Sequence, residues 1–191
     1  MARSDQENPI THDDIEAHYA SLFGAPDERH VYRTKTHSFA VLCWSPQKTG
    51  EDVYIFATVG AYAAMGTPTE RCEFFFGLTE KPAGVADSIA EVALDGNGTG
   101  RVPSSGDTVT LAFALWDGTR ATSYMFTDGG DEIVPRLRRN ATVVEFIQLV
   151  PLFADEVDYK KAHGEEALWR HFEDNHVAYW DPDRISSLSD G

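Results

Sequence analysis

The stretch "VVEFIQLVPLFADEVDYKKAHGEEALWRHF", Val143–Phe172, combines two patterns that together decide the fold. Its first half is a nearly continuous apolar run, which is typical of a strand buried on both faces of a sheet. Pro151 is expected to end the ladder of this strand, because proline has no amide hydrogen to donate. The second half predicts two short helices, over residues 155–163 and 165–175, separated by Gly164. A buried strand followed by a helix pair favours a domain in which helices cover a sheet.

The segments before this stretch follow one another in an irregular order of helix and strand. A helix is predicted to begin after Thr11, because Asp13 and Asp14 would then lie near the positive end of its dipole, and to stop at Gly24. A second, short helix is expected around residues 85–92. Strand patterns occur at residues 32–44, 52–60, 71–78, 107–116 and 123–129. Because helices and strands do not alternate regularly, we predict an α+β domain with a mixed or largely antiparallel sheet, flanked by an N-terminal helix and a C-terminal helix pair.

The length of the chain favours a single domain. With 191 residues, of which 42% are apolar, the chain can bury a sizeable core. We expect residues 1–10 to form a flexible N-terminus, residues 11–180 to form the domain, and residues 181–191 to form a C-terminal tail.

The charge of the chain restricts its partners. Lysine and arginine total 16, and aspartate and glutamate total 31, so the formal net charge is −15. This charge repels phosphate backbones, and we therefore expect no nucleic acid among the partners. It favours fast encounter with a basic partner instead. Within the predicted helix pair, Glu156 and Lys160 are spaced as an exposed ion pair.

The sequence favours a cytoplasmic location. The N-terminus has no apolar segment of signal-peptide length, and no window approaches the roughly 18 apolar residues of a membrane span, so we expect no membrane partner. Cys43 and Cys72 lie in apolar, strand-like runs, where cysteine behaves as a small apolar residue. Two such cysteines do not make a disulfide framework, which is typical of a reducing compartment.

The chain has no pattern of a metal or cofactor site. Seven histidines are present, but His12 and His18 are six residues apart and would point to different faces of one helix. Neither an HExxH motif nor a cysteine–histidine cluster occurs. The loop "DGNGTGRVPSSGD", residues 95–107, lacks the Gly-Lys-Ser/Thr of a phosphate-binding loop. We therefore predict neither a metal nor a cofactor.

Glu73 and Glu145 are the carboxylates of greatest interest for chemistry, since each interrupts a strand rich in apolar residues. Buried together, they would form an acid–base pair suited to a hydrolase-type enzyme. Alternatively, each lies on the wet face of a half-covered sheet, or accepts a hydrogen bond from an arginine such as Arg71. We favour the second interpretation and predict no catalytic residue, and the hydrolase stays the alternative.

The stretch "TVGAYAAMGTPTER", Thr58–Arg71, contains the candidate binding residues. It follows a strand that is apolar on both faces, and it combines small residues with Tyr62 and Met65. A loop that exposes tyrosine and methionine is suited to protein contacts, because both residue types are favoured where proteins meet. Alternatively, the two side chains fold back on the core as part of an ordinary strand connection.

The Val143–Phe172 stretch resembles the end of the suppressor-of-fused-like domain. That family has a strand with the pattern FhQhhP, where h is apolar, followed by an acidic helix start and then by the motif HGxxxL. The residues that fit are Val144, Phe146, Gln148, Leu149, Pro151, Glu156, His163, Gly164 and Leu168. The segments "DVYIFATVGAYAAMG", "CEFFFGL" and "GDTVTLAFALW" resemble earlier strands of the family in the same order, so the resemblance covers roughly residues 37–173.

The resemblance implies an α+β domain that binds another protein and is not an enzyme. Bacterial single-domain members of this length resemble immunity proteins of polymorphic toxin systems, and a charge of −15 would steer such a protein onto a basic toxin. The chain departs from the family after the buried strand, where Gly60 matches but "AYAAM" replaces the usual residues. No binding residue is therefore carried over from the family.

Overall fold

The computed structural model describes residues 10–35, 38–61, 70–95, 101–128 and 132–189. The helices in these ranges are α1 (His12–Phe23), α2 (Pro46–Thr49), α3 (Val85–Asp95), α4 (Ala154–His163) and α5 (Glu165–Asp174). The strands are β1 (Glu28–Arg33), β2 (Ser38–Trp44), β3 (Tyr54–Val59), β4 (Glu70–Leu78), β5 (Thr108–Thr110), β6 (Ser123–Thr127), β7 (Leu137–Arg139) and β8 (Thr142–Leu152).

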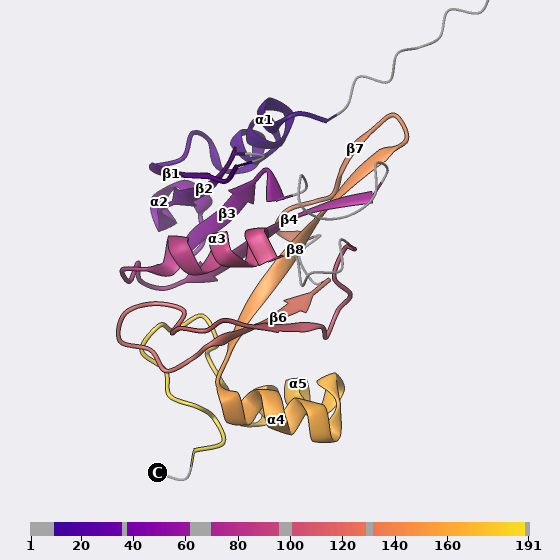
Figure 1. Ribbon diagram of the computed structural model, residues 1–191. Helices are drawn as coiled ribbons and strands as arrows, with labels where there is room; N and C mark the ends of the chain where they lie inside the picture. Colours follow the sequence, from indigo (N-terminus) through magenta and orange to yellow (C-terminus); the bar gives the residue numbers. More distant parts are fainter. Residues whose placement is uncertain (1–9, 36–37, 62–69, 96–100, 129–131, 190–191) are drawn as a thin grey trace, which may run out of the picture.

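The strands of the described residues form one mixed sheet. Its order is β1-β2-β3-β4-β8-β6-β5, and β7 pairs with β8 beside this path. β4 and β8 are parallel, whereas the other neighbouring strands are antiparallel. Figure 1 shows the long β8 crossing the molecule diagonally, with β2, β3 and β4 on one side and β6 on the other. The α+β class and the mixed, largely antiparallel sheet predicted from the sequence are confirmed.

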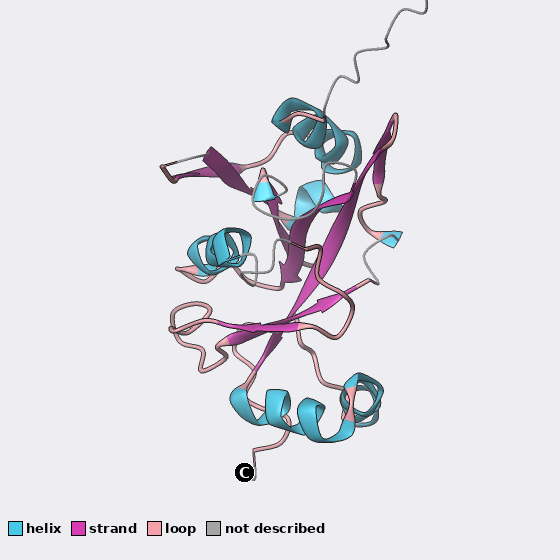
Figure 2. Ribbon diagram, turned by 45° about the vertical axis from the view of Figure 1, so that its right-hand side comes forward, coloured by secondary structure: helices cyan, strands magenta, loops and turns pink. Residues whose placement is uncertain are grey.

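Helices cover both faces and one end of the sheet. α1 packs on one face through Ile15, Tyr19 and Phe23, and α3 packs on the opposite face. Along β4, Phe74 belongs to the cluster on the α3 side and Phe75 to the cluster on the α1 side, as the two-residue period of a strand requires. Figures 1 and 2 both show α4 and α5 at the lower end of the molecule, far from α1 at the top.

α1 begins and ends as the sequence predicts. Thr11 Oγ1 accepts a hydrogen bond from Asp14 N at 3.3 Å, and Thr11 N donates to Asp14 Oδ2 at 2.9 Å. This reciprocal capping box satisfies two amide groups that the first helical turn leaves without intrahelical partners. Gly24 follows the last residue of the helix with a φ of 74°, a conformation that favours glycine.

The strand predicted over residues 107–116 is much shorter in the structure. Regular pairing is limited to Thr108–Thr110. Leu111 and Leu115 then pack into the core on the α3 side along an irregular path, while Phe113 between them is 45% exposed. The prediction was wrong because residues 111, 113 and 115 would share one face of a strand, whereas Leu111 and Leu115 are buried and Phe113 is exposed.

The prediction that Pro151 ends the ladder of β8 was also wrong. β8 continues through Pro151 to Leu152, and Pro151 lies opposite Tyr124 of β6. β4 pairs with β8 only as far as Gln148, so β8 has a single neighbouring strand at the proline. A missing amide hydrogen is tolerated at such a position, because one side of the strand forms no ladder.

No helix among the described residues is long and apolar enough to cross a membrane. Cys43 and Cys72 are both buried and form no disulfide with each other. The domain boundaries at residues 10 and 180 stay predictions.

Candidate functional site

Glu73 is fully buried on the α1 side of the sheet, where its carboxylate accepts several hydrogen bonds. Oε2 accepts from Thr58 Oγ1 at 2.6 Å and from Ala61 N at 3.2 Å, and Oε1 accepts from Gly60 N at 2.8 Å. These donors belong to the end of β3 and to the turn after it. Glu73 therefore ties this turn to β4, which is a structural use of a buried carboxylate.

Glu145 points to the opposite face of the sheet. In the parallel pairing of β4 with β8, Glu73 lies opposite Phe146, and Cys72 lies opposite Glu145. Phe146 belongs to the cluster on the α1 side and Cys72 to the cluster on the α3 side, so the two carboxylates are separated by the sheet itself. Glu145 is 35% exposed and lies 3.4 Å from Arg136 Nε. The acid–base pair considered for a hydrolase is therefore not formed.

The described residues offer little for metal or thiol chemistry. Among them, no three side chains of histidine, cysteine, aspartate or glutamate gather as a metal site would require. Burial raises the pKa of the Cys43 thiol to about 12. Burial also raises the pKa of the Cys72 thiol. Both thiols stay protonated at neutral pH and are poor nucleophiles.

Tyr62 and Met65, the binding residues predicted from the sequence, lie outside the described residues. The turn that leads to them is described as far as Ala61, whose amide bonds to Glu73. The contact loop therefore stays a prediction.

An exposed groove lies on the α1 side of the sheet, beyond the part that α1 covers. It consists of two adjoining hollows that share Tyr179 and Trp180, and we call it the aromatic groove. The first hollow, of about 250 Å³, includes Ile55, Phe75 and Gln148 from the sheet. The second hollow, of about 590 Å³, is lined in addition by Trp169, Phe172, Glu173, His176 and Val177.

A buried ion pair fixes the chain that follows the aromatic groove. Arg184 Nη1 donates to Glu156 Oε1 at 2.7 Å, and Arg184 Nη2 donates to Glu156 Oε2 at 2.9 Å. Nη2 also donates to the carbonyl oxygen of Pro151 at 2.6 Å, and the guanidinium lies 4.7 Å from the ring centroid of Phe153. Because Pro151 and Glu156 belong to β8 and α4, the pair joins the C-terminal segment to two elements of the sheet-and-helix core.

The interpretation of Glu156 and Lys160 as an exposed ion pair was wrong. The side chain of Glu156 is fully buried in its contact with Arg184. Lys160 instead donates to Thr108 Oγ1 at 2.6 Å. Spacing within a helix could not reveal this, because the true partner of Glu156 comes from a segment that lies beyond α5.

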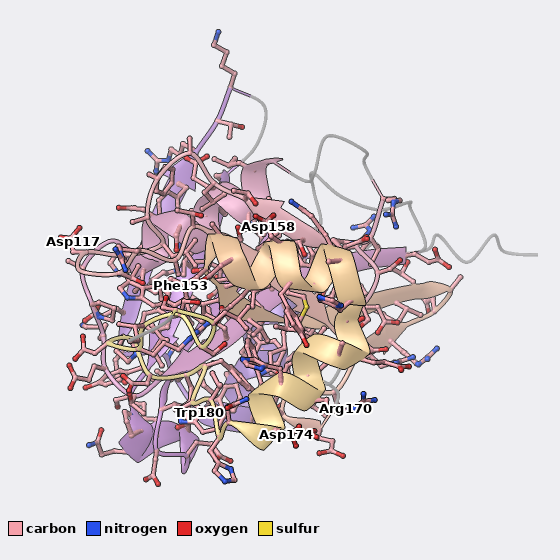
Figure 3. The ribbon with its side chains drawn as sticks, turned by 90° about the horizontal axis from the view of Figure 1, so that it is seen from below. Asp117, Phe153, Asp158, Arg170, Asp174 and Trp180 are labelled. Carbon is pink, nitrogen blue, oxygen red and sulfur yellow. The ribbon has the colours of Figure 1, made fainter. Side chains whose placement is uncertain are left out.

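The charged residues that line the aromatic groove are acidic, apart from a histidine. Glu51 belongs to the first hollow and Glu173 to the second. Trp180 between them is 42% exposed, so the groove presents apolar surface to solvent. Figure 3 shows Trp180 beside the end of α5, where Asp174 lies. Exposed aromatic surface bordered by carboxylates is typical of a site that binds a partner of opposite charge.

The aromatic groove was not predicted from the sequence. A signal was present in "AYWDPD", Ala178–Asp183, where two adjacent aromatic residues follow the last helix without an apolar pattern that would bury them. Trp169 of α5 lies half-buried at the groove. The groove exists only because the segment after α5 returns to the ends of β3 and β4.

The comparisons with known proteins agree with this fold. The family model described as "Suppressor of fused protein (SUFU)" matches residues 35–185. A search of curated protein sequences finds no match to this chain. The suppressor of fused homologue from Neisseria gonorrhoeae is similar in structure, with a TM-score of 0.67, 15% identity, and coverage of 92% of this chain and 95% of that chain.

Two further structures are similar to this chain. The Sufu–Fu complex matches with a TM-score of 0.69 and 12% identity, covering 94% of this chain and 93% of that chain. Drosophila Suppressor of Fused matches with a TM-score of 0.67 and 12% identity, covering 95% of this chain and 52% of that chain. The likeness to these structures concerns the fold, whereas the family model matches the sequence over most of the chain. The chain therefore belongs to the suppressor of fused family.

Proposed function

We propose that this chain is a protein-binding domain that acts as an immunity protein and neutralises a toxin domain with a basic surface. The observation that carries the proposal is the aromatic groove, where the exposed Trp180 and the half-buried Tyr179 lie between Glu51 and Glu173. Aromatic rings are favoured at the centre of protein interfaces, and carboxylates at the border select a basic partner.

The family supports binding as the activity. One of the similar structures is the Sufu–Fu complex, so a protein with this fold forms a complex with another protein. The separation of Glu73 and Glu145 by the sheet also favours binding over the hydrolase alternative, because the two carboxylates cannot act on one substrate.

The charge of the chain supports a basic partner. A net charge of −15 steers a basic protein toward the chain over distances at which no contact is yet formed. A basic toxin that acts on nucleic acid has a cationic surface for phosphates, and an acidic protein would cover that surface. Neutralisation would then follow from occlusion of the toxin's own binding site.

The experiment first asks whether the neighbouring gene encodes a protein with a toxin domain, and then mixes that domain with the purified chain. We expect a stoichiometric complex by calorimetry and loss of toxin activity at equimolar chain. The association rate should fall steeply between about 50 and about 500 mM salt, because salt screens long-range attraction. An unrelated protein of comparable negative charge serves as the control and should leave the toxin active.

Two results would count against the proposal. If the chain does not bind the toxin domain at low salt, the immunity role is wrong. If the unrelated acidic protein inhibits equally well, the effect is charge alone and the aromatic groove has no part in it.

A further inference from the structure

Besides the buried Phe172, three aromatic rings line the second hollow of the aromatic groove: Trp169, Tyr179 and Trp180. The rings of Trp169 and Tyr179 have centroids 5.8 Å apart and planes at 74°. The rings of Tyr179 and Trp180 have centroids 4.8 Å apart and planes at 77°. Nearly perpendicular neighbours present ring faces in different directions around the hollow of about 590 Å³. Such an arrangement surrounds a ligand group with several π-systems.

The backbone at Trp180 and the ring of Trp169 are held by hydrogen bonds without a ligand. The carbonyl oxygen of Trp180 accepts a hydrogen bond from Thr79 N at 2.9 Å, which joins this segment to the end of β4. Tyr179 lies beside Gln148 of β8, with which it lines the first hollow. Trp169 Nε1 donates to Glu165 Oε1 at 3.3 Å. A site whose walls are partly fixed in advance loses less conformational entropy on binding.

The electrostatics of the hollow favour a cation. The faces of indole and phenol rings carry negative electrostatic potential, which attracts ammonium and guanidinium groups. Glu173 lines the same hollow, and its side chain is exposed, so it adds a full negative charge at the opening. His176 also lines the hollow.

We propose that the second hollow is an aromatic cage that takes the head group of a lysine or arginine side chain from a partner protein. The first hollow shares Tyr179 and Trp180 with the cage and has Ile55 and Phe75 on its floor. A partner segment therefore places a basic residue in the cage and an apolar side chain in the adjoining hollow. This inference deepens the proposed function and rests on it for the identity of the natural partner.

The experiment uses the full chain labelled with ¹⁵N and a capped peptide, acetyl-Gly-Lys-Gly-Leu-Gly-amide, at pH 8, where an imidazole is ordinarily neutral. The indole N–H resonances of Trp169 and Trp180 should shift saturably as the peptide is added. The comparison peptide has norleucine in place of lysine, which keeps the aliphatic stem and removes the charge. We expect it to bind at least about tenfold more weakly, as a desolvated cation–π contact implies.

Matched variants distinguish binding in the cage from effects of a substitution elsewhere on the surface. Trp180→Ala should weaken lysine-peptide binding at least about tenfold, and Trp180→Phe should retain a part of it because a ring face remains. Phe113→Ala is the control, since Phe113 is 45% exposed, close to the 42% of Trp180, but lies outside the groove. Glu173→Gln should weaken binding severalfold, while Glu91→Gln, at an exposed residue of α3, should leave it unchanged.

The outcomes for the cage and for the toxin can be told apart. Equal binding of the two peptides, full binding by Trp180→Ala, or no saturable shift up to about 10 mM peptide overturns the cage. If the toxin domain binds Trp180→Ala as tightly as the parent chain, the proposed function stands and the cage is wrong. If the lysine peptide binds as expected but the toxin domain does not, the cage stands and the proposed partner is wrong.

Discussion

Glu73 illustrates how one polar side chain can be required within an apolar sheet. Its carboxylate receives hydrogen bonds from the hydroxyl of Thr58 and from the amides of Gly60 and Ala61. The amides belong to a turn, where no strand partner is available for them. A buried amide that loses its acceptor costs about 1–3 kcal/mol, so the turn depends on this carboxylate.

We therefore expect Glu73→Ala to lower the free energy of unfolding by about 2–5 kcal/mol, because it leaves several buried donors without an acceptor. Urea denaturation followed by circular dichroism measures the change. Glu145→Ala is the matched control, since that carboxylate is partly exposed and contacts Arg136. The free energy of unfolding of the control variant should fall by at most about 1 kcal/mol. Equal losses in the two variants would mean that Glu73 has no special role.

At the scale of elements, the C-terminal segment is positioned by α4 and not by its own secondary structure. Glu156 Oε2 accepts a hydrogen bond from Phe153 N at 3.0 Å at the start of α4. Oε1 accepts from the amide of Ser187 at 3.0 Å and from its hydroxyl at 2.9 Å. With Arg184 bound to both oxygens, one buried carboxylate joins the beginning of α4 to a segment that has no helix or strand.

Removal of one partner of this ion pair should destabilise the fold strongly. We expect Arg184→Ala to lower the free energy of unfolding by about 3–5 kcal/mol, because Glu156 would be left buried without its counter-charge. Arg170→Ala, at an exposed position of α5, is the control and should change stability by less than about 0.5 kcal/mol.

A second readout locates the effect of Arg184→Ala. Hydrogen exchange should show earlier exchange at the Ser187 amide, whose acceptor is Glu156. The double variant Glu156→Gln with Arg184→Met should recover a part of the loss, since it leaves no unpaired charge. If Arg184→Ala lowers the free energy of unfolding by less than about 1 kcal/mol, the buried ion pair does not stabilise the fold as expected.

At the scale of the whole molecule, buried thiol and phenol groups should make the free energy of unfolding sensitive to alkaline pH. Burial raises the pKa of Cys43 to about 12. Burial likewise raises the pKa of Cys72 and of Tyr124 above their ordinary values. The unfolded chain ionises these groups near their ordinary pKa values, about 8.5 for cysteine and about 10 for tyrosine. The stability they contribute is full below that range and is lost as the pH rises through the pKa of the folded state.

We expect the free energy of unfolding to be nearly constant from pH about 7 to about 8 and to decrease toward pH about 11. Each such group contributes a slope of up to about 1.4 kcal/mol per pH unit once it is ionised in the unfolded chain. Urea denaturation at a series of pH values measures the curve. Cys43→Ala should make the decrease shallower between pH about 9 and about 10.5. A flat curve in the parent chain over this range would contradict the prediction.

Most elements could be predicted because their signals are local. The two-residue period and apolar composition of β4 and the core of β8 identify them as buried strands, and the charge pattern with Gly164 identifies α4 and α5. β1 and β7 are polar edge strands whose pairing depends on a neighbour, so local patterns do not distinguish them from loops. The residues after β5 escaped prediction for a related reason, since their burial is set by the core they meet.

The sequence by itself determined the fold class, the family and the acidic charge, because each depends on residues close together or on a simple sum. Only the tertiary structure decided that Glu73 and Glu145 lie on opposite faces, since this follows from the register between β4 and β8. It likewise decided that Arg184 pairs with Glu156 and that Trp180 lies near Phe75. These contacts join segments far apart in the chain, and their free energy is gained only when the whole sheet and the helices on it are assembled.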